Sequence, residues 1–125
     1  SGLDAGKIYQ TWPMMNNNYF PNDVLINSFI NLIDFDNHSL VQFYHRNLAY
    51  MITFYIFVLS AFIFYKNLKN LYTPLKIVFI FLIIQVILGI FTLLSGLNIF
   101  LASAHQITSV ILVFSAIYLY YYQAK

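Results

Sequence analysis

The chain has 125 residues, of which 61% are hydrophobic and 8% are charged. Soluble domains carry about a quarter of their residues as charged side chains, so this composition indicates a membrane protein. The net charge of +2 is too small and too scattered to predict binding to nucleic acid. The sequence has no cysteine, which excludes disulfides, thiolate metal sites and cysteine nucleophiles, and it has no glutamate.

Residues 1–38 predict a segment outside the membrane. Glycines, prolines and the asparagine run at 16–18 break the first 22 residues, which is typical of a loop. The next run, 23–35, mixes apolar and polar residues and is too short to span a bilayer, so it predicts a helix lying in the membrane interface. The chain begins with Ser1 and shows no signal-peptide pattern, which indicates a piece of a longer protein.

Residues 39–125 predict a domain of three membrane-spanning helices, at about 40–65, 74–94 and 99–122. Each span is long enough to cross a hydrocarbon core of about 30 Å. Ser39 followed by Gln42 is typical of a capping box at a helix start. Thr73 and Pro74 predict an N-cap followed by a proline in the first turn of the second span. The fold class is therefore all-α and integral to a membrane.

The charges predict an orientation for the three spans. Lys66, Lys69 and Lys76 follow the first span and Lys125 ends the chain, whereas all four aspartates lie in residues 1–38. By the positive-inside rule, residues 1–38 face the outer side of a bacterial plasma membrane or of a mitochondrial inner membrane.

Two histidines are the candidate ligands of a metal. His45 and His105 follow the starts of the first and third spans by five and six residues, which places them roughly 7–9 Å deep on the same side. Two imidazoles at one level can bind one metal ion or the two axial positions of one haem. The sequence shows no third or fourth ligand for zinc. The alternative is a pair of structural residues that hydrogen-bond between helices.

The neighbours of the histidines extend this candidate site. Arg46 and Gln106 each follow a histidine directly. An arginine at membrane depth needs a partner, and a haem propionate would provide a carboxylate, although lipid phosphate is an alternative. His38 precedes the expected helix and is interpreted as a solvated loop residue. One face of the second span is expected to turn inward, with Gln85, Gly89, Thr92 and Gly96 at helical spacing.

Four stretches carry a resemblance to a known family. GLDAGKIYQTWPMM, VQFYHRNLAY, QVILGIFTLLSG and LASAHQ occur in this order, and together they resemble the C-terminal half of the haem A synthase family of cytochrome oxidase assembly proteins. The resemblance implies a four-helix haem-binding half-bundle, of which three helices would be present here. It also implies that His45 and His105 are the axial ligands of a b-type haem.

The resemblance further implies an oxidoreductase activity for the whole protein. The family oxidises the ring D methyl group of haem O to a formyl group, with the substrate haem in the N-terminal half beside a glutamate. That half is absent here, so no catalytic residue is expected in this chain, and its haem would serve electron transfer. The implied partners are the N-terminal half of the same protein, haem O, an electron acceptor, haem O synthase and the lipid bilayer.

Two other functions are compatible with the residues alone. The first is a cytochrome b-like membrane anchor subunit that carries haem for a partner dehydrogenase. The second is a membrane protein without haem, in which the histidines only pack.

Overall fold

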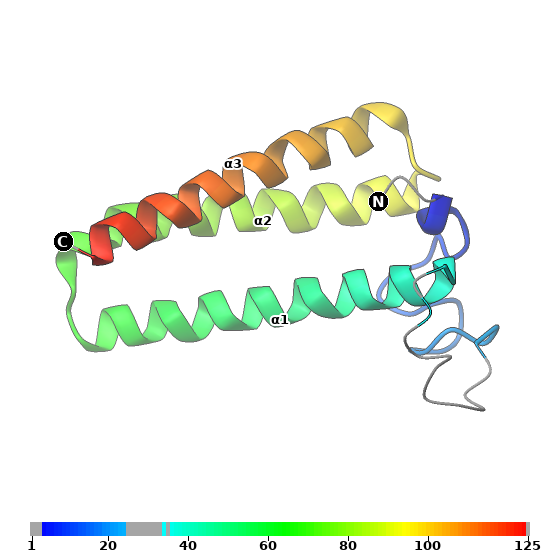
Figure 1. The fold of residues 1–125 in the computed structure, drawn as a ribbon, viewed down its shortest axis with the longest axis horizontal. Coiled ribbons are helices and arrows are strands. Elements are labelled where there is room, and N and C mark those ends of the chain that lie inside the picture. Colours follow the sequence, from blue (N-terminus) through cyan, green and yellow to red (C-terminus); the bar gives the residue numbers. More distant parts are fainter. Residues whose placement is uncertain (1–3, 25–33, 35, 125) are drawn as a thin grey trace.

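The computed structural model describes residues 4–24, 34 and 36–124, and three long helices dominate this part of the chain (Figure 1). The three predicted spans are confirmed to within two residues at each end, whereas the helix predicted at 23–35 lies almost entirely outside the described residues. The elements in order are η1 (Asp4–Lys7), α1 (His38–Tyr65), η3 (Lys69–Leu71), α2 (Tyr72–Leu94) and α3 (Ile99–Gln123).

The long helices lie side by side along the molecule, and its two ends differ (Figure 1). Residues 4–24 gather at the end where α1 begins and where α2 turns into α3, and we call this the loop end. The opposite end carries the connection from α1 to α2, with Lys66 and Lys69, and the C-terminus of the chain, and we call it the lysine end.

The surfaces of the three helices are apolar on nearly all sides. Phe54, Tyr65 and Phe100 are 71%, 84% and 82% exposed, and many other large apolar side chains point outward. Each helix is long and apolar enough to cross a membrane. In water such a surface would drive aggregation, whereas in a bilayer it contacts lipid and the helices satisfy their own backbone groups. The chain is therefore an integral membrane protein.

The first turn of α1 differs from the predicted capping box. Asn37 is the N-cap, and its Oδ1 accepts hydrogen bonds from the main-chain N–H groups of Ser39 (3.0 Å) and Leu40 (3.2 Å). The capping box of Ser39 and Gln42 is therefore wrong. The physical reason is that the loop lies against this turn and supplies other partners for both side chains, as described below.

The start of α2 also differs from the prediction. The cap by Thr73 is wrong, because α2 begins at Tyr72 with Leu71 in the N-cap position and with no hydrogen bond from a capping side chain. The turn η3 leads directly into α2. Pro74 still falls in the first turn, where the missing N–H costs no intrahelical hydrogen bond.

Both connections between the long helices begin with the same C-terminal motif. The residue after the C-cap is left-handed, with φ of 54° at Asn67 and 68° at Gly96. The paired 6→1 and 5→2 hydrogen bonds of a Schellman motif follow in each case, and they satisfy carbonyls at the helix end. These bonds are Leu68 N–H to Ile63 O, Asn67 N–H to Phe64 O, Leu97 N–H to Thr92 O and Gly96 N–H to Leu93 O.

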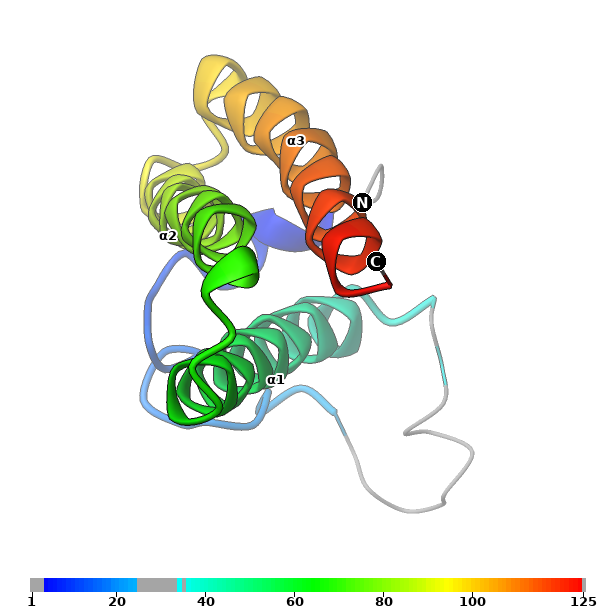
Figure 2. The same ribbon diagram turned by 90° about the vertical axis from the view of Figure 1, so that its left-hand side faces the viewer.

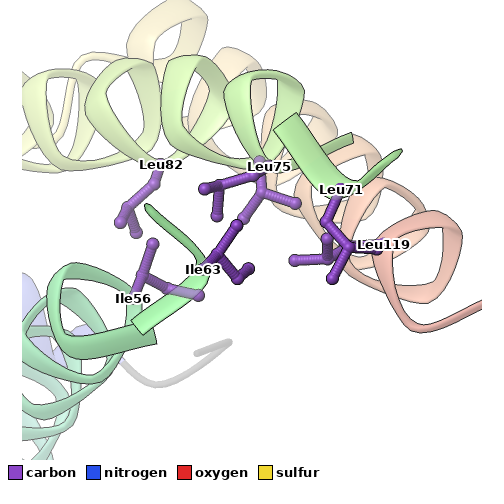
Figure 3. Close-up of a cluster of buried hydrophobic side chains, with 7 residues drawn as sticks. Ile56, Ile63, Leu71, Leu75, Leu82 and Leu119 are labelled. Carbon is purple, nitrogen blue, oxygen red and sulfur yellow. The ribbon is translucent and has the colours of Figure 1, made fainter. Parts of the chain in front are cut away.

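The helices pack unequally, as the end-on view shows (Figure 2). Helix α2 packs mainly against α3, and α1 contacts α2 much less. An apolar cluster near the lysine end joins all three helices by van der Waals contact, which drives helix association in lipid (Figure 3). Its buried members are Ile56, Ile63, Leu71, Leu75, Val78, Leu82 and Leu119. Near the middle of their lengths, α1 and α2 leave a hollow of about 140 Å³ between them.

Candidate functional site

The structure brings the two predicted histidines together near the loop end. His45 lies about two turns into α1 and His105 about two turns into α3. The centres of the two imidazole rings are 6.3 Å apart, and the ring planes meet at 74°. The prediction that these two residues face each other at one level is confirmed.

The spacing of the rings fits two ligands of one iron. A bond from a metal to an imidazole nitrogen is about 2.0 Å and that nitrogen lies about 1.1 Å from the ring centre, so two opposite ligands have ring centres about 6 Å apart. The described parts of the chain contain no cluster of three or more His, Cys, Asp or Glu side chains that could hold a metal ion. Two imidazoles could hold the iron of a haem, whereas a tetrahedral zinc ion would need further ligands.

His105 is held by a single residue of α2. Its Nδ1 lies 3.1 Å from the main-chain oxygen of Gln85, and its Nε2 lies 3.3 Å from the side-chain nitrogen of Gln85. A carbonyl can only accept, so we assign the proton to Nδ1 and the lone pair to Nε2, which then accepts from the amide. Hydrogen bonding of Nδ1–H to a main-chain carbonyl is the usual way in which a metal-binding histidine is oriented.

The surroundings of His105 fix both the amide and the ring. Thr108 Oγ1 donates to Gln85 Oε1 at 2.6 Å, which directs the amide nitrogen towards the ring. Gly89 lies one turn further along α2, and a Cβ at this position would meet Cε1 of His105 at 3.0 Å. The prediction that Gln85 and Gly89 turn inward is confirmed. Gly96 lies beyond the end of α2 and faces Gln10 instead.

His45 has a more open environment than His105. Its side chain is exposed, and its ring contacts the ring of His105. The ring of His45 makes no hydrogen bond with the described residues, whereas both ring nitrogens of His105 contact Gln85. The two candidate ligands are therefore oriented by different means.

Arg46 and Gln42 bind the loop. Arg46 donates from Nη1 to the carbonyls of Pro13 (3.4 Å) and Met14 (3.2 Å), and from Nη2 to the carbonyl of Tyr9 (3.1 Å). Gln42, one turn earlier, donates to the same carbonyl of Tyr9 at 2.8 Å. Arg46 Nε is buried and has no partner in the described part of the chain. The sequence carried no signal for these partners, because main-chain carbonyls have no signature in side-chain type.

The loop also covers the turn between α2 and α3. A Cβ on Gly6 would lie 2.9 Å from Cδ1 of Leu97, and a Cβ on Gly96 would lie 3.6 Å from the amide of Gln10. Residues 6–10 thus contact the α2–α3 connection, while the carbonyl of Tyr9 is bound by α1. The loop joins α1 to the α2–α3 connection at the loop end (Figure 1). His45 and His105 lie about two turns from this end.

A carboxylate anchors the loop to the start of α1. Asp23 accepts hydrogen bonds from the hydroxyl of Tyr9 at 2.6 Å and from Oγ of Ser39 at 2.5 Å. Burial raises the pKa of Asp23, but the hydrogen bonds from Ser39 and Tyr9 outweigh it, so the pKa lies below its usual value. Burial and the adjacent Asp23 carboxylate raise the pKa of the Tyr9 hydroxyl.

The remaining candidates are Gln106 and His38. The side chain of Gln106 is exposed and makes no hydrogen bond with the described residues, and its carbonyl accepts a hydrogen bond from Oγ of Ser109. His38, predicted to be a loop residue, is the first residue of α1, because the N-cap is Asn37 rather than Ser39.

The fold and the site together define a class of protein, namely a helical membrane protein with a pair of facing histidines near one end of its bundle. Residues 1–117 match the family described as cytochrome oxidase assembly protein. Among curated relatives, the chain is 44% identical to a "Heme A synthase" of Pelagibacter ubique, over 98% of this chain and 36% of the relative.

Two further relatives support the same assignment. The chain is 38% identical to a "Heme A synthase" of Wolbachia pipientis wMel, over 100% of this chain and 34% of the relative. It is 33% identical to a "Heme A synthase" of Rickettsia felis, over 97% of this chain and 36% of the relative. No solved structure matches the chain. The chain belongs to the haem A synthase family of cytochrome oxidase assembly proteins, and it spans about a third of the length of these relatives.

Proposed function

We propose that this chain is the C-terminal, haem b-binding part of a haem A synthase, with His45 and His105 as the two axial ligands. The observation that carries the proposal is the pair of imidazole rings 6.3 Å apart on α1 and α3. Family membership supports it, because relatives of the same family are named for haem A synthesis. The orientation of His105 by the carbonyl of Gln85 supports it further.

Each residue of this site has a separate task in the proposal. His105 presents Nε2 from α3 while Gln85 holds the proton on Nδ1. His45 presents its ring from α1 at the same level. Arg46 and Gln106 bind the carboxylates of the haem. The Nε–H of Arg46 has no hydrogen-bond partner among the described residues, and the side chain of Gln106 is exposed. The bound haem supplies one-electron redox chemistry.

The role of this part of the protein follows from the reaction of the whole enzyme. Converting the ring D methyl group of haem O into a formyl group removes four electrons from that carbon. In the proposal, this chain carries no catalytic residue and serves the electron transfer, while haem O is oxidised in the N-terminal half of the same protein. The other partners are an electron acceptor and haem O synthase.

We also place the loop end on the outer face of a bacterial plasma membrane or a mitochondrial inner membrane. Lys66, Lys69 and Lys76 lie at or near the lysine end, and the positive-inside rule puts that end on the cytoplasmic or matrix side. Arg46 at the loop end binds carbonyls of the loop, so its charge lies next to loop residues 9–14.

A reduced-minus-oxidised visible spectrum of the purified full-length protein tests the proposal. We expect a sharp b-type α band that is lost in His45→Ala and in His105→Ala. His38→Ala is the matched control, because this third histidine lies at the start of α1, about two turns from His45. A band of wild-type intensity in both of the first two variants would remove the histidine pair from haem binding.

A further inference from the structure

The lone pair on Nε2 of His105 already has a partner in the protein. The side-chain nitrogen of Gln85 lies 3.3 Å from it, and the main-chain oxygen of the same residue lies 3.1 Å from Nδ1. One residue therefore contacts both ring nitrogens, with its main chain on one and its side chain on the other. An iron ion bound to Nε2 would use the same lone pair as the amide, so the two contacts exclude each other.

Thr108 keeps a hydrogen bond when the amide of Gln85 moves. Its hydroxyl donates to Gln85 Oε1 at 2.6 Å. The same Oγ1 lies 2.9 Å from the carbonyl of Ala104 and 3.1 Å from that of His105. When the amide of Gln85 moves away, the hydroxyl proton can turn to either carbonyl, so the hydroxyl of Thr108 does not lose its acceptor.

We propose that the side chain of Gln85 is an exchangeable cap on His105, which leaves Nε2 when the haem iron binds. This inference rests on the proposed function. In the exchange, the hydrogen bond from the amide breaks and an iron–nitrogen bond forms on the same lone pair. The proton stays on Nδ1 and no electron moves.

The main chain of Gln85 has the complementary task. Its carbonyl holds Nδ1–H before and after the exchange, so the ring keeps its tautomer and its direction. Gly89 leaves the space in which the ring lies. Gln85 is thus a positioning residue whose side chain competes with the haem while its main chain prepares the ligand.

The experiment measures binding of ferric haem b to full-length protein prepared without haem in detergent. Gln85→Leu removes the amide and keeps the carbonyl, and Thr108→Val removes the hydroxyl that directs the amide. We expect Gln85→Leu to bind haem faster and with about fivefold higher affinity, which corresponds to the loss of one net hydrogen bond. We expect Thr108→Val to raise the affinity by a smaller factor. The matched control is Gln123→Leu at the lysine end of α3, which should leave binding unchanged.

The sign of the effect separates the cap from a merely structural role. A structural glutamine would weaken haem binding when it is removed, so unchanged or weaker binding in Gln85→Leu overturns the proposal. If that variant does not fold, Thr108→Val decides in the same way. If the wild-type protein gives no low-spin spectrum with added haem, the proposed function itself is contradicted. If the wild-type protein binds haem but the variants bind it no better, only the cap is contradicted.

Discussion

His105 contacts Gln85 of α2 through both ring nitrogens, whereas the ring of His45, whose centre lies 6.3 Å from that of His105, makes no hydrogen bond with the described residues. The difference follows from how the helices pack, because α2 packs closely against α3 while α1 contacts α2 much less. Near the loop end α1 is held mainly by the loop, through Arg46 and Gln42. One histidine of the pair is therefore oriented by the bundle, and the other is carried by a helix that the loop positions.

The largest effect on haem binding is expected from filling the space beside His105. Gly89→Leu places a side chain where the ring lies, since even a Cβ would be 3.0 Å from Cε1. Overpacking of this kind costs about 1–3 kcal/mol, so we expect haem to bind roughly 5- to 150-fold more weakly. Titration of the haem-free full-length protein with ferric haem b measures the change.

The control for this substitution introduces the same leucine side chain at an exposed position. Ser103→Leu enlarges a side chain on α3 two residues before His105, where the residue is exposed. We expect it to leave haem affinity unchanged. Equal losses in Gly89→Leu and Ser103→Leu would show that the space beside His105 has no special role.

The two histidines should contribute differently to the stability of the haem-free protein. His105→Ala removes two hydrogen bonds and leaves the amide of Gln85 without its ring partner, so we expect a loss of about 1–2 kcal/mol in the free energy of unfolding. His45→Ala removes an exposed ring with no hydrogen bond to the described residues, and we expect a loss below about 0.5 kcal/mol. Denaturant unfolding in detergent measures both values, and equal losses would contradict the difference between the two environments.

Much of the fold could be predicted from the sequence because it depends on local, one-dimensional patterns. The spans follow from long apolar runs between charges, and the equal depth of His45 and His105 follows from counting residues from the helix starts. The inward face of α2 follows from the helical spacing of Gln85 and Gly89.

The remaining features depend on contacts between segments that are distant in the sequence. Ser39 and Gln42 have the pattern of a capping box, but the loop provides Asp23 and the carbonyl of Tyr9 as partners instead. Arg46 was expected to need a haem carboxylate or a lipid phosphate, and it contacts three carbonyls of the loop. No local pattern encodes the approach of a loop to a helix that begins many residues later in the chain.

The smallest expected effect concerns the loop that positions α1. The folded-state pKa of Asp23 is lowered, because hydrogen bonds from Ser39 and Tyr9 outweigh its burial. The stabilising contribution is therefore present above the unfolded pKa of about 4 and is lost as the pH falls through the lower folded value. We expect amide hydrogen exchange of residues 9–18, corrected for the intrinsic rate, to become faster as the pH falls below about 4. Because Asp23 is exposed and water screens it, the change should be only a few-fold, and Asp23→Asn should abolish the pH dependence. An unaltered pH dependence in this variant would mean that another group controls how the loop, and with it His45, is held.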